Sequence, residues 1–425
     1  MARALVSYLV FSALYLGLRL PLLTQPLVGE EGVFAQLVRE RPSHPNFLWI
    51  GRLQGADLYT APEHPRALYE PLRFAGAILR LAPESWAAPK RVAMIRLSVA
   101  GFQLCFWLAL LTMAQRLKGG RWSPLPSVIL LSSAPLAVLT SIELQIDGSV
   151  GVFLCGFAAL FLCGAESAAS LFAAGLLSGL GKQEWGVALL GAALGTLVCF
   201  RARADTRRQL GWIVSGILAG HAFNAAIDWH NYVGGWNVAG RVGKVSVVAV
   251  AASLASWIDV LALRLPVIVS VLVLLGLGGL ALRGRWTPAL AAAAMFSGCL
   301  FLGFALSTWE PRSVRYFSPA FAVAAVVAVR GSVEQRLPWL RLASSVLALQ
   351  ALWLVRAALM HGTALTLALG APLEPQRVLP ANGACVPAAN PADAFGHDRD
   401  FVSFALDPTL RRMLADEHRA QLCER

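Results

Sequence analysis

Residues 4–23 have the sequence ALVSYLVFSALYLGLRLPLL, and residues 28–35, just beyond them, have the sequence VGEEGVFA. The first stretch is about as long as a helix that crosses the hydrocarbon core of a bilayer, which takes roughly 20 residues. No small-residue cleavage site follows it, so we expect it to stay in the chain as the first membrane span. The second stretch puts two adjacent carboxylates where the chain leaves the membrane. A purely structural helix bundle does not require acids there.

The composition as a whole is that of a polytopic membrane protein. Of the 425 residues, 57% are hydrophobic and 14% charged, and the mean hydropathy is +0.62, whereas a soluble domain averages about 25% charged residues. Apolar segments of near-spanning length recur, so we predict an all-α fold with about eleven transmembrane helices. Residues 245–263 are apolar but carry Asp259, and they could be an interfacial segment or part of a span. Beyond the first, the expected spans are 92–114, 125–140, 148–164, 168–181, 185–200, 210–227, 265–282, 287–306, 316–329 and 340–359.

The basic residues predict the orientation of these spans. The formal net charge is +12, and arginine and lysine cluster in short loops on one side of the predicted membrane. By the positive-inside rule that side is cytoplasmic, so we expect the amino terminus inside and the carboxyl terminus outside. The sequence has no nucleic-acid motif, so nucleic acid is not an expected partner. The clusters are Arg116/Lys118/Arg121, Arg201/Arg203/Arg207/Arg208, Arg283/Arg285 and Arg330/Arg336.

The expected organisation is a membrane domain, residues 1–360, followed by a small extracytoplasmic tail, residues 361–425. Residues 24–90 of the membrane domain form a long extracytoplasmic loop, called the first loop below. Within it, residues 31–39 are predicted to form a short helix, and residues 64–81 an interfacial helix lying on the bilayer. A disulfide between Cys385 and Cys423 is expected if the tail is extracytoplasmic. The other cysteines fall in apolar runs and are expected in the core.

Polar residues from five separate loops are predicted to share the outer face, and this shared location is the strongest functional signal in the sequence. The loops are the first loop, those with Glu143/Asp147 and Lys182/Glu184, and residues 228–244 and 310–315. A carboxylate at such a surface can take a proton from a hydroxyl group, and Glu30 and Glu31 are the candidates. Glu143 and Asp147 lie one helical turn apart, so they would share a helix face and could position a substrate or bind a metal ion. The alternative for these acids is to cap or solvate a helix end.

Cationic residues on the same face could bind a phosphate group. Arg312 and Arg315 would present two guanidinium groups, whose planar forks match phosphate oxygens; the alternative is contact with lipid headgroups. Lys182 could also hold phosphate, or it could pair with Glu184 or Glu143. No cluster has metal-ligand spacing, so no metal site is predicted, and the use of a divalent cation is left open. The sequence also has no nucleotide-binding loop, so the energy for a reaction would reside in the donor itself.

These motifs, in this order, resemble those of GT-C type integral-membrane glycosyltransferases, nearest to the protein O-mannosyltransferase and lipid A aminoarabinose transferase branch. The family's acidic pair at the start of the first loop is matched by Glu30 and Glu31, with glutamate at the first position in place of the usual aspartate. Its His-Pro-Pro-Leu-Tyr element is matched by residues 64–69, with an arginine and an extra residue interrupting it. Its Arg-Tyr-Leu-x-Pro element is matched by residues 315–319, and a Gly-x-x-x-Leu-x-Lys-x element loosely by residues 175–183. The resemblance covers roughly residues 1–330.

The resemblance implies a glycosyltransferase that moves a sugar from a polyprenyl-phosphate-linked donor to a hydroxyl or lipid acceptor on the outer face, with inversion. It also implies the inner (plasma) membrane of a bacterium as the location. It implies that Glu30 or Glu31 is the general base and that arginines hold the donor phosphate. Two alternatives remain: a transporter or flippase of lipid-linked glycans, and an inactive scaffold with the same fold. His64 could also make only a local hydrogen bond. The candidate substrate-binding residues are His64, Tyr69, Glu143, Asp147, Lys182, Arg312, Arg315 and Tyr316.

Overall fold

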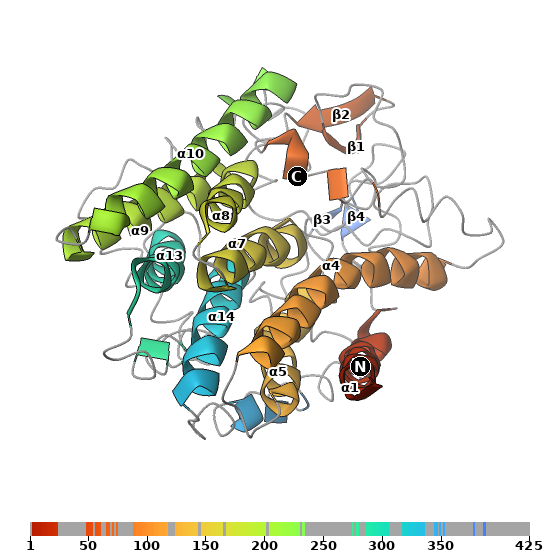
Figure 1. Cartoon of the computed structure of the whole chain (residues 1–425). Coiled ribbons are helices and arrows are strands. Elements are labelled where there is room, and N and C mark those ends of the chain that lie inside the picture. The colour runs from red at the N-terminus through yellow and green to blue at the C-terminus, as the bar shows by residue number, and fades with distance from the viewer. Residues whose placement is uncertain are drawn as a thin grey trace.

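The computed structural model of the chain is a bundle of helices with two short hairpins (Figure 1). Helices α8, α9 and α10 lie together on one side, α7 and α14 lie in the middle, and α1, α4 and α5 lie on the other side. The structure describes residues 2–23, 48–53, 56–60, 65–68, 70, 71, 74, 88–117, 124–142, 146–164, 167–200, 204–229, 232–233, 274, 278–279, 286–305, 317–335, 344–346, 348–349, 352, 377–378 and 386–387.

The helices follow the apolar segments of the sequence. Within the described ranges, five helical segments are long and apolar enough to cross a membrane, or six if one bent pair forms a single span, and three further apolar helices are shorter. The expected spans 265–282 and 340–359 lie largely outside the described residues, so the total of about eleven stays a prediction. The helices are α1 (Ala2–Arg19), α4 (Ala88–Arg116), α5 (Leu125–Ser132), α6 (Pro135–Ile142), α7 (Val152–Gly164), α8 (Ala168–Leu180), α9 (Gln183–Phe200), α10 (Ala204–Ile227), α13 (Pro288–Ala305) and α14 (Ser318–Gln335).

The expected span 125–140 is broken into two helices, α5 and α6, which are bent by 75°. The break precedes Pro135, the first residue of α6. Proline has no backbone N–H to donate, and its ring clashes with the carbonyl one turn earlier, so an α-helix cannot run straight through it. The hydropathy of the segment predicted a single crossing because an average over twenty residues does not register one proline.

The buried guanidinium of Arg19, at the end of α1, fills this break. Its Nη2 atom donates to the carbonyl oxygens of Ser132, at 2.9 Å, and Ala137, at 3.1 Å, and its Nε atom donates to Ser141 Oγ at 2.5 Å. The guanidinium also stacks 3.5 Å over the ring of Tyr15. The carbonyl of Ser132, the last residue of α5, has no partner within its helix. Arg19 therefore satisfies a group that the bend leaves open, and its bonds tie α1 to α5 and α6.

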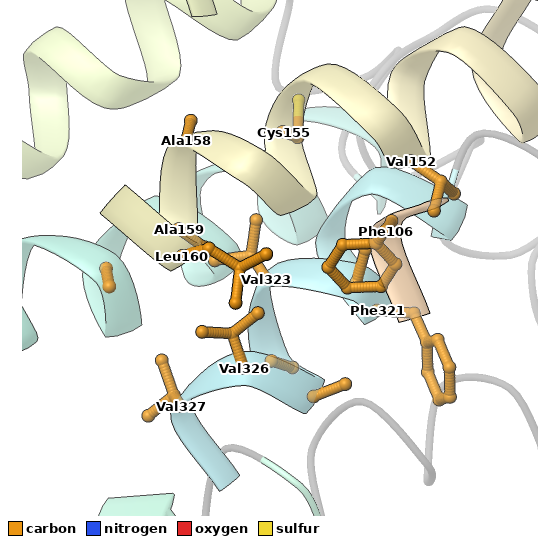
Figure 2. Close-up of a cluster of buried hydrophobic side chains, with 14 of the residues drawn as sticks. Phe106, Val152, Cys155, Ala158, Ala159, Leu160, Phe321, Val323, Val326 and Val327 are labelled. Atoms are coloured by element: carbon orange, nitrogen blue, oxygen red, sulfur yellow. The ribbon is translucent and has the colours of Figure 1, made fainter. Parts of the chain in front are cut away.

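The centre of the bundle is the contact between α7 and α14 (Figure 2). Helix α14 carries a run of alanine and valine, residues 322–329, all of them fully buried. Small and β-branched side chains allow close approach of neighbouring helices, which is how helices associate where lipid supplies no hydrophobic driving force. Helix α4 closes this core with Phe106, whose ring lies 2.5 Å from where a Cβ on Gly156 of α7 would stand.

Helices α8 and α10 cross through two matching pairs of glycines, Gly175 and Gly179 on α8 and Gly216 and Gly220 on α10. A Cβ on Gly179 would lie 2.5 Å from the Ile217 carbonyl oxygen, and one on Gly220 would lie 2.7 Å from the backbone of α8. Each helix therefore presents a small-x-x-x-small stripe to the backbone of the other. Because the helices touch backbone to backbone, this crossing fixes where the end of α8 lies.

The described part of the first loop contains a hairpin that was not expected. Strand β1 (Leu48–Leu53) pairs with strand β2 (Ala56–Thr60) in antiparallel register, in a part of the loop for which no element was predicted. A short 3-10 helix, η2 (Arg66–Leu68), follows and contacts α10. Of the two predicted loop helices, residues 31–39 lie outside the described residues, and in the range 64–81 the residues that are described include η2 and helical residues 70, 71 and 74. In the tail, a second hairpin pairs β3 (Arg377–Val378) with β4 (Val386–Pro387).

The cysteines of the apolar runs divide between the core and the outer surface of the bundle. Cys155 and Cys163 are buried as predicted, and Cys299 is half-buried, but the prediction was wrong for Cys105 and Cys199, which are exposed. An apolar run places a cysteine in a membrane helix without saying which face it occupies. A side chain facing lipid is as apolar in its surroundings as one facing the core. The predicted pair Cys385 and Cys423 lies outside the described residues.

We expect Gly216→Ala to lower the unfolding midpoint of the protein in detergent. The added Cβ would meet the backbone of α8 at Phe172 and Leu176, and overpacking of this kind costs about 1–3 kcal/mol. Gly211→Ala is the matched control, because a Cβ at that position of the same helix meets nothing within 4 Å. An equal midpoint for the two variants would contradict the close crossing of α8 and α10.

Candidate functional site

A π-helical segment, η3 (Ile146–Gly151), leads directly into α7, and all of its residues are buried. π-Helical turns are rare and occur often at functional sites. Its two glycines are in close contact with neighbouring segments: a Cβ on Gly148 would lie 2.5 Å from the Thr140 carbonyl oxygen, and one on Gly151 would lie 2.9 Å from the ring of Trp185. Larger side chains would push η3 away, so these glycines set the place of Asp147.

Asp147 of η3 forms a buried ion pair with Lys182, in the turn between α8 and α9. The Nζ atom lies 2.9 Å from each carboxylate oxygen and donates a hydrogen bond to Oδ2. The two side chains are only 3% and 5% exposed. Two charges removed from water are tolerated when they compensate each other. This pair therefore joins the start of α7 to the start of α9 across 35 residues of sequence.

Two further elements reach η3 from other parts of the chain. Gln103 of α4 donates a hydrogen bond from Nε2 to the carbonyl oxygen of Gly148. Pro319, at the start of α14, lies 3.0 Å from where a Cβ on Gly151 would stand. The start of α14 is itself held by Ser297 of α13, whose Oγ donates to the Ala320 carbonyl at 2.8 Å. Helices α4, α7, α9 and α14 thus meet at one place.

The end of α8, next to Lys182, is capped by a side chain from α10. Asn224 Nδ2 donates to the carbonyl oxygens of Gly179, at 3.0 Å, and Leu180, at 3.2 Å. These are among the last carbonyls of the helix, which have no partner within it. Gln183, the first residue of α9, donates from Nε2 to the Tyr232 carbonyl at 2.9 Å, beyond the end of α10. These contacts fix the turn that carries Lys182.

Arg96 of α4 holds the point where the chain leaves the first span. Its Nη1 atom donates to the carbonyl oxygens of Leu22 and Leu23, each at 3.3 Å, and its side chain is fully buried. Leu23 is the last described residue before the acidic pair Glu30 and Glu31.

The structure brings together two of the predicted site residues, Asp147 and Lys182. Their mutual pairing was not predicted, since the sequence suggested Glu184 or Glu143 as the alternative partner of Lys182. The roles of the other predicted residues stay predictions, because they lie outside the described residues: Glu30, Glu31, His64, Tyr69, Glu143, Arg312, Arg315 and Tyr316.

Segments that adjoin these undescribed residues do lie against the helices of the site. Leu68, next to Tyr69, is fully buried in η2, which contacts α10. Phe317, next to Tyr316, is also buried and packs against Phe301 of α13, with 5.5 Å between ring centroids and the ring planes tilted by 42°. Within the described part of the chain, no three His, Cys, Asp or Glu side chains gather where they could hold a metal ion.

Sequence reasoning passed over four buried polar side chains near this end of the bundle, Arg19, Arg96, Gln103 and Trp185. A signal for the two arginines was present, because an ionisable residue inside an apolar span is costly and marks a functional or structural site by default. Gln103 and Trp185 carried no such signal. Both lie inside apolar runs, where a glutamine and a tryptophan differ little from their neighbours in average hydropathy.

We expect Lys182→Met to destabilise the protein by about 3–5 kcal/mol, because it leaves the carboxylate of Asp147 buried without its cation. The double variant Asp147→Asn/Lys182→Met removes both charges and should recover a large part of the loss, and Lys182→Arg should retain most of the stability. The measurement is thermal unfolding in detergent or nanodiscs. A double variant as unstable as Lys182→Met would contradict the ion pair.

No family model matches the sequence, and no curated protein matches it. The structure is similar to the crystal structure of ArnT from Cupriavidus metallidurans in the apo state, with a TM-score of 0.52 and 17% sequence identity over 85% of this chain and 73% of that chain. ArnT is a lipid A aminoarabinose transferase of the GT-C type. At this identity the similarity shows the fold. The chain is therefore an integral membrane protein with the GT-C-like fold of ArnT.

Proposed function

We propose that the protein is a glycosyltransferase that moves a sugar from a polyprenyl-phosphate-linked donor to a hydroxyl or lipid acceptor on the outer face of the inner membrane. The observation that carries the proposal is the buried pair of Asp147 and Lys182, set in a GT-C-like fold at the end of the bundle where the first loop begins. A charge pair inside a membrane protein is costly to maintain and is typical of a functional site.

In the proposed reaction the acceptor oxygen attacks the anomeric carbon of the sugar from the face opposite the phosphate. The bond between that carbon and the phosphate oxygen breaks, and polyprenyl phosphate leaves with the electron pair. Glu30 or Glu31 takes the proton of the acceptor hydroxyl. Attack from the opposite face inverts the configuration at the anomeric carbon.

The departing phosphate needs cations, and Arg312 and Arg315 are the proposed ones. Lys182 has its charge matched by Asp147, so in this scheme its part is to hold Asp147 in place beside the donor. Asp147, with Glu143, then positions the substrate. His64, Tyr69 and Tyr316 are proposed to contact the donor or the acceptor, and no metal ion is required by this scheme.

The location of the buried charges favours transfer over transport. Among the described residues, the buried charged side chains all lie at or near the ends of their spans or in the turn beside one. A transporter places such groups near the middle of the membrane, where its substrate is held between alternating states. Those residues are Arg19, Arg96, Asp147 and Lys182.

The test is transfer of radiolabelled sugar from a polyprenyl-phosphate donor in proteoliposomes. We expect Glu30→Gln or Glu31→Gln to lower the rate at least about 100-fold, because a general base contributes about 100-fold to 10,000-fold. The double variant should be inactive while still folded. Asp205→Asn is the matched control, because that carboxylate is exposed at the start of α10, far along the helix from the site.

Full activity of the double variant would exclude these residues as the base. Movement of the intact donor across the bilayer without sugar transfer would identify a flippase. A wild-type protein that does neither would be an inactive scaffold.

A further inference from the structure

Four buried polar atoms without a hydrogen-bond partner in the described part of the chain belong to residues in or adjoining η3. They are Gln103 Oε1 on α4, Asp147 Oδ1 on η3, Trp185 Nε1 on α9 and Ser318 Oγ on α14. Leaving a buried polar group unpaired costs about 1–3 kcal/mol, so native proteins contain few of them. Four such atoms from four elements that meet at one place require an explanation.

Trp185 and the residue after Ser318 both contact the Gly151 end of η3. A Cβ on Gly151 would stand 2.9 Å from both Cζ2 and Cη2 of the indole and 3.0 Å from Cγ of Pro319. In an indole, Cζ2 is bonded to the ring carbon that carries Nε1, so the N–H lies on the edge of the ring nearest Gly151. Ser318 directly precedes Pro319, so its backbone adjoins the contact between Pro319 and Gly151.

Gln103 and Asp147 complete the group from the other end of η3. The Gln103 amide donates to the Gly148 carbonyl, which fixes the amide orientation and leaves Oε1 as an acceptor. Asp147 accepts a hydrogen bond from Lys182 at Oδ2. Its Oδ1 lies 2.9 Å from the same ammonium group without a hydrogen bond, so this oxygen keeps a lone pair with which it can accept from a ligand. The group thus offers two acceptor oxygens, one N–H donor and one hydroxyl that can do either.

We propose that Gln103, Asp147, Trp185 and Ser318 bind the sugar ring of the donor. This inference rests on the proposed function. It adds to that function the part of the site that would contact the sugar, and so would distinguish a sugar-bearing donor from the bare lipid phosphate. Sugar hydroxyls can donate to Gln103 and Asp147 and accept from Trp185, so a bound sugar satisfies all four groups.

Trp107 provides an internal comparison. Its indole nitrogen is also buried without a partner in the described residues, but its neighbours are the rings of Phe106, at 4.9 Å, and Phe321, at 6.5 Å between centroids. It lies one helical turn beyond Gln103 along α4. An unpaired indole N–H alone therefore does not make a binding group, and the surrounding acceptors and hydroxyl distinguish Trp185 from Trp107.

The test measures the binding of two kinds of probe by the full-length protein in nanodiscs. One probe is undecaprenyl phosphate, and the other is undecaprenyl phosphate carrying glucose, mannose or arabinose. Trp185→Phe removes the N–H and keeps an aromatic ring, and we expect it to weaken binding of the sugar-bearing probe roughly tenfold, the effect of losing one buried hydrogen bond. Binding of undecaprenyl phosphate should be unchanged. Ser318→Ala should act in the same direction with less disturbance of packing.

Trp107→Phe is the matched control, and it should leave the binding of both probes unchanged. The inference is overturned if Trp185→Phe and Ser318→Ala bind the sugar-bearing probe as tightly as the wild type, or if they weaken binding of both probes equally. If the wild type binds none of the sugar-bearing probes, the proposed function fails as well. The two failures are distinguishable, because in the first the wild type still binds and transfers sugar.

Discussion

The ion pair between Asp147 and Lys182 is the constraint on which the rest of this end of the molecule depends. Hydrocarbon does not solvate charge, so the two side chains must meet inside the protein. For them to meet, η3 has to lie against the turn between α8 and α9. The glycines of η3 allow that approach on one side, and the glycine crossing of α8 and α10 fixes the turn on the other. Small residues far from any charge are therefore part of what holds the pair.

The architecture could be predicted from the sequence wherever an apolar run corresponds to one helix. The first span, the span beginning at residue 92 and the pair at 185–200 and 210–227 follow directly from their hydropathy. The segment 125–140 did not, because Pro135 breaks it into α5 and α6. The hairpin of the first loop was also missed, since strands in a loop leave a much weaker periodic pattern than amphipathic helices do.

Some residues of the candidate site could be predicted from the sequence, but the contacts between them could not. Asp147 and Lys182 were both selected as polar residues at span ends, yet nothing local in the sequence connects residues 35 positions apart. Gln103 and Trp185 were not selected, because their location next to η3 depends on which faces of α4 and α9 are turned toward that segment. The pairing of helix faces is decided by packing of the whole bundle, and a single sequence does not reveal it.

The elbow between α5 and α6 has a mechanical consequence. Arg19 is wedged between the two helices and is bonded to both, and Tyr15 of the same helix donates from its hydroxyl to the Ala100 carbonyl on α4 at 3.2 Å. Straightening the elbow would strand a guanidinium in an environment without water. Any movement of α6 would therefore have to carry α1 with it, so that these two helices can change position only as one body.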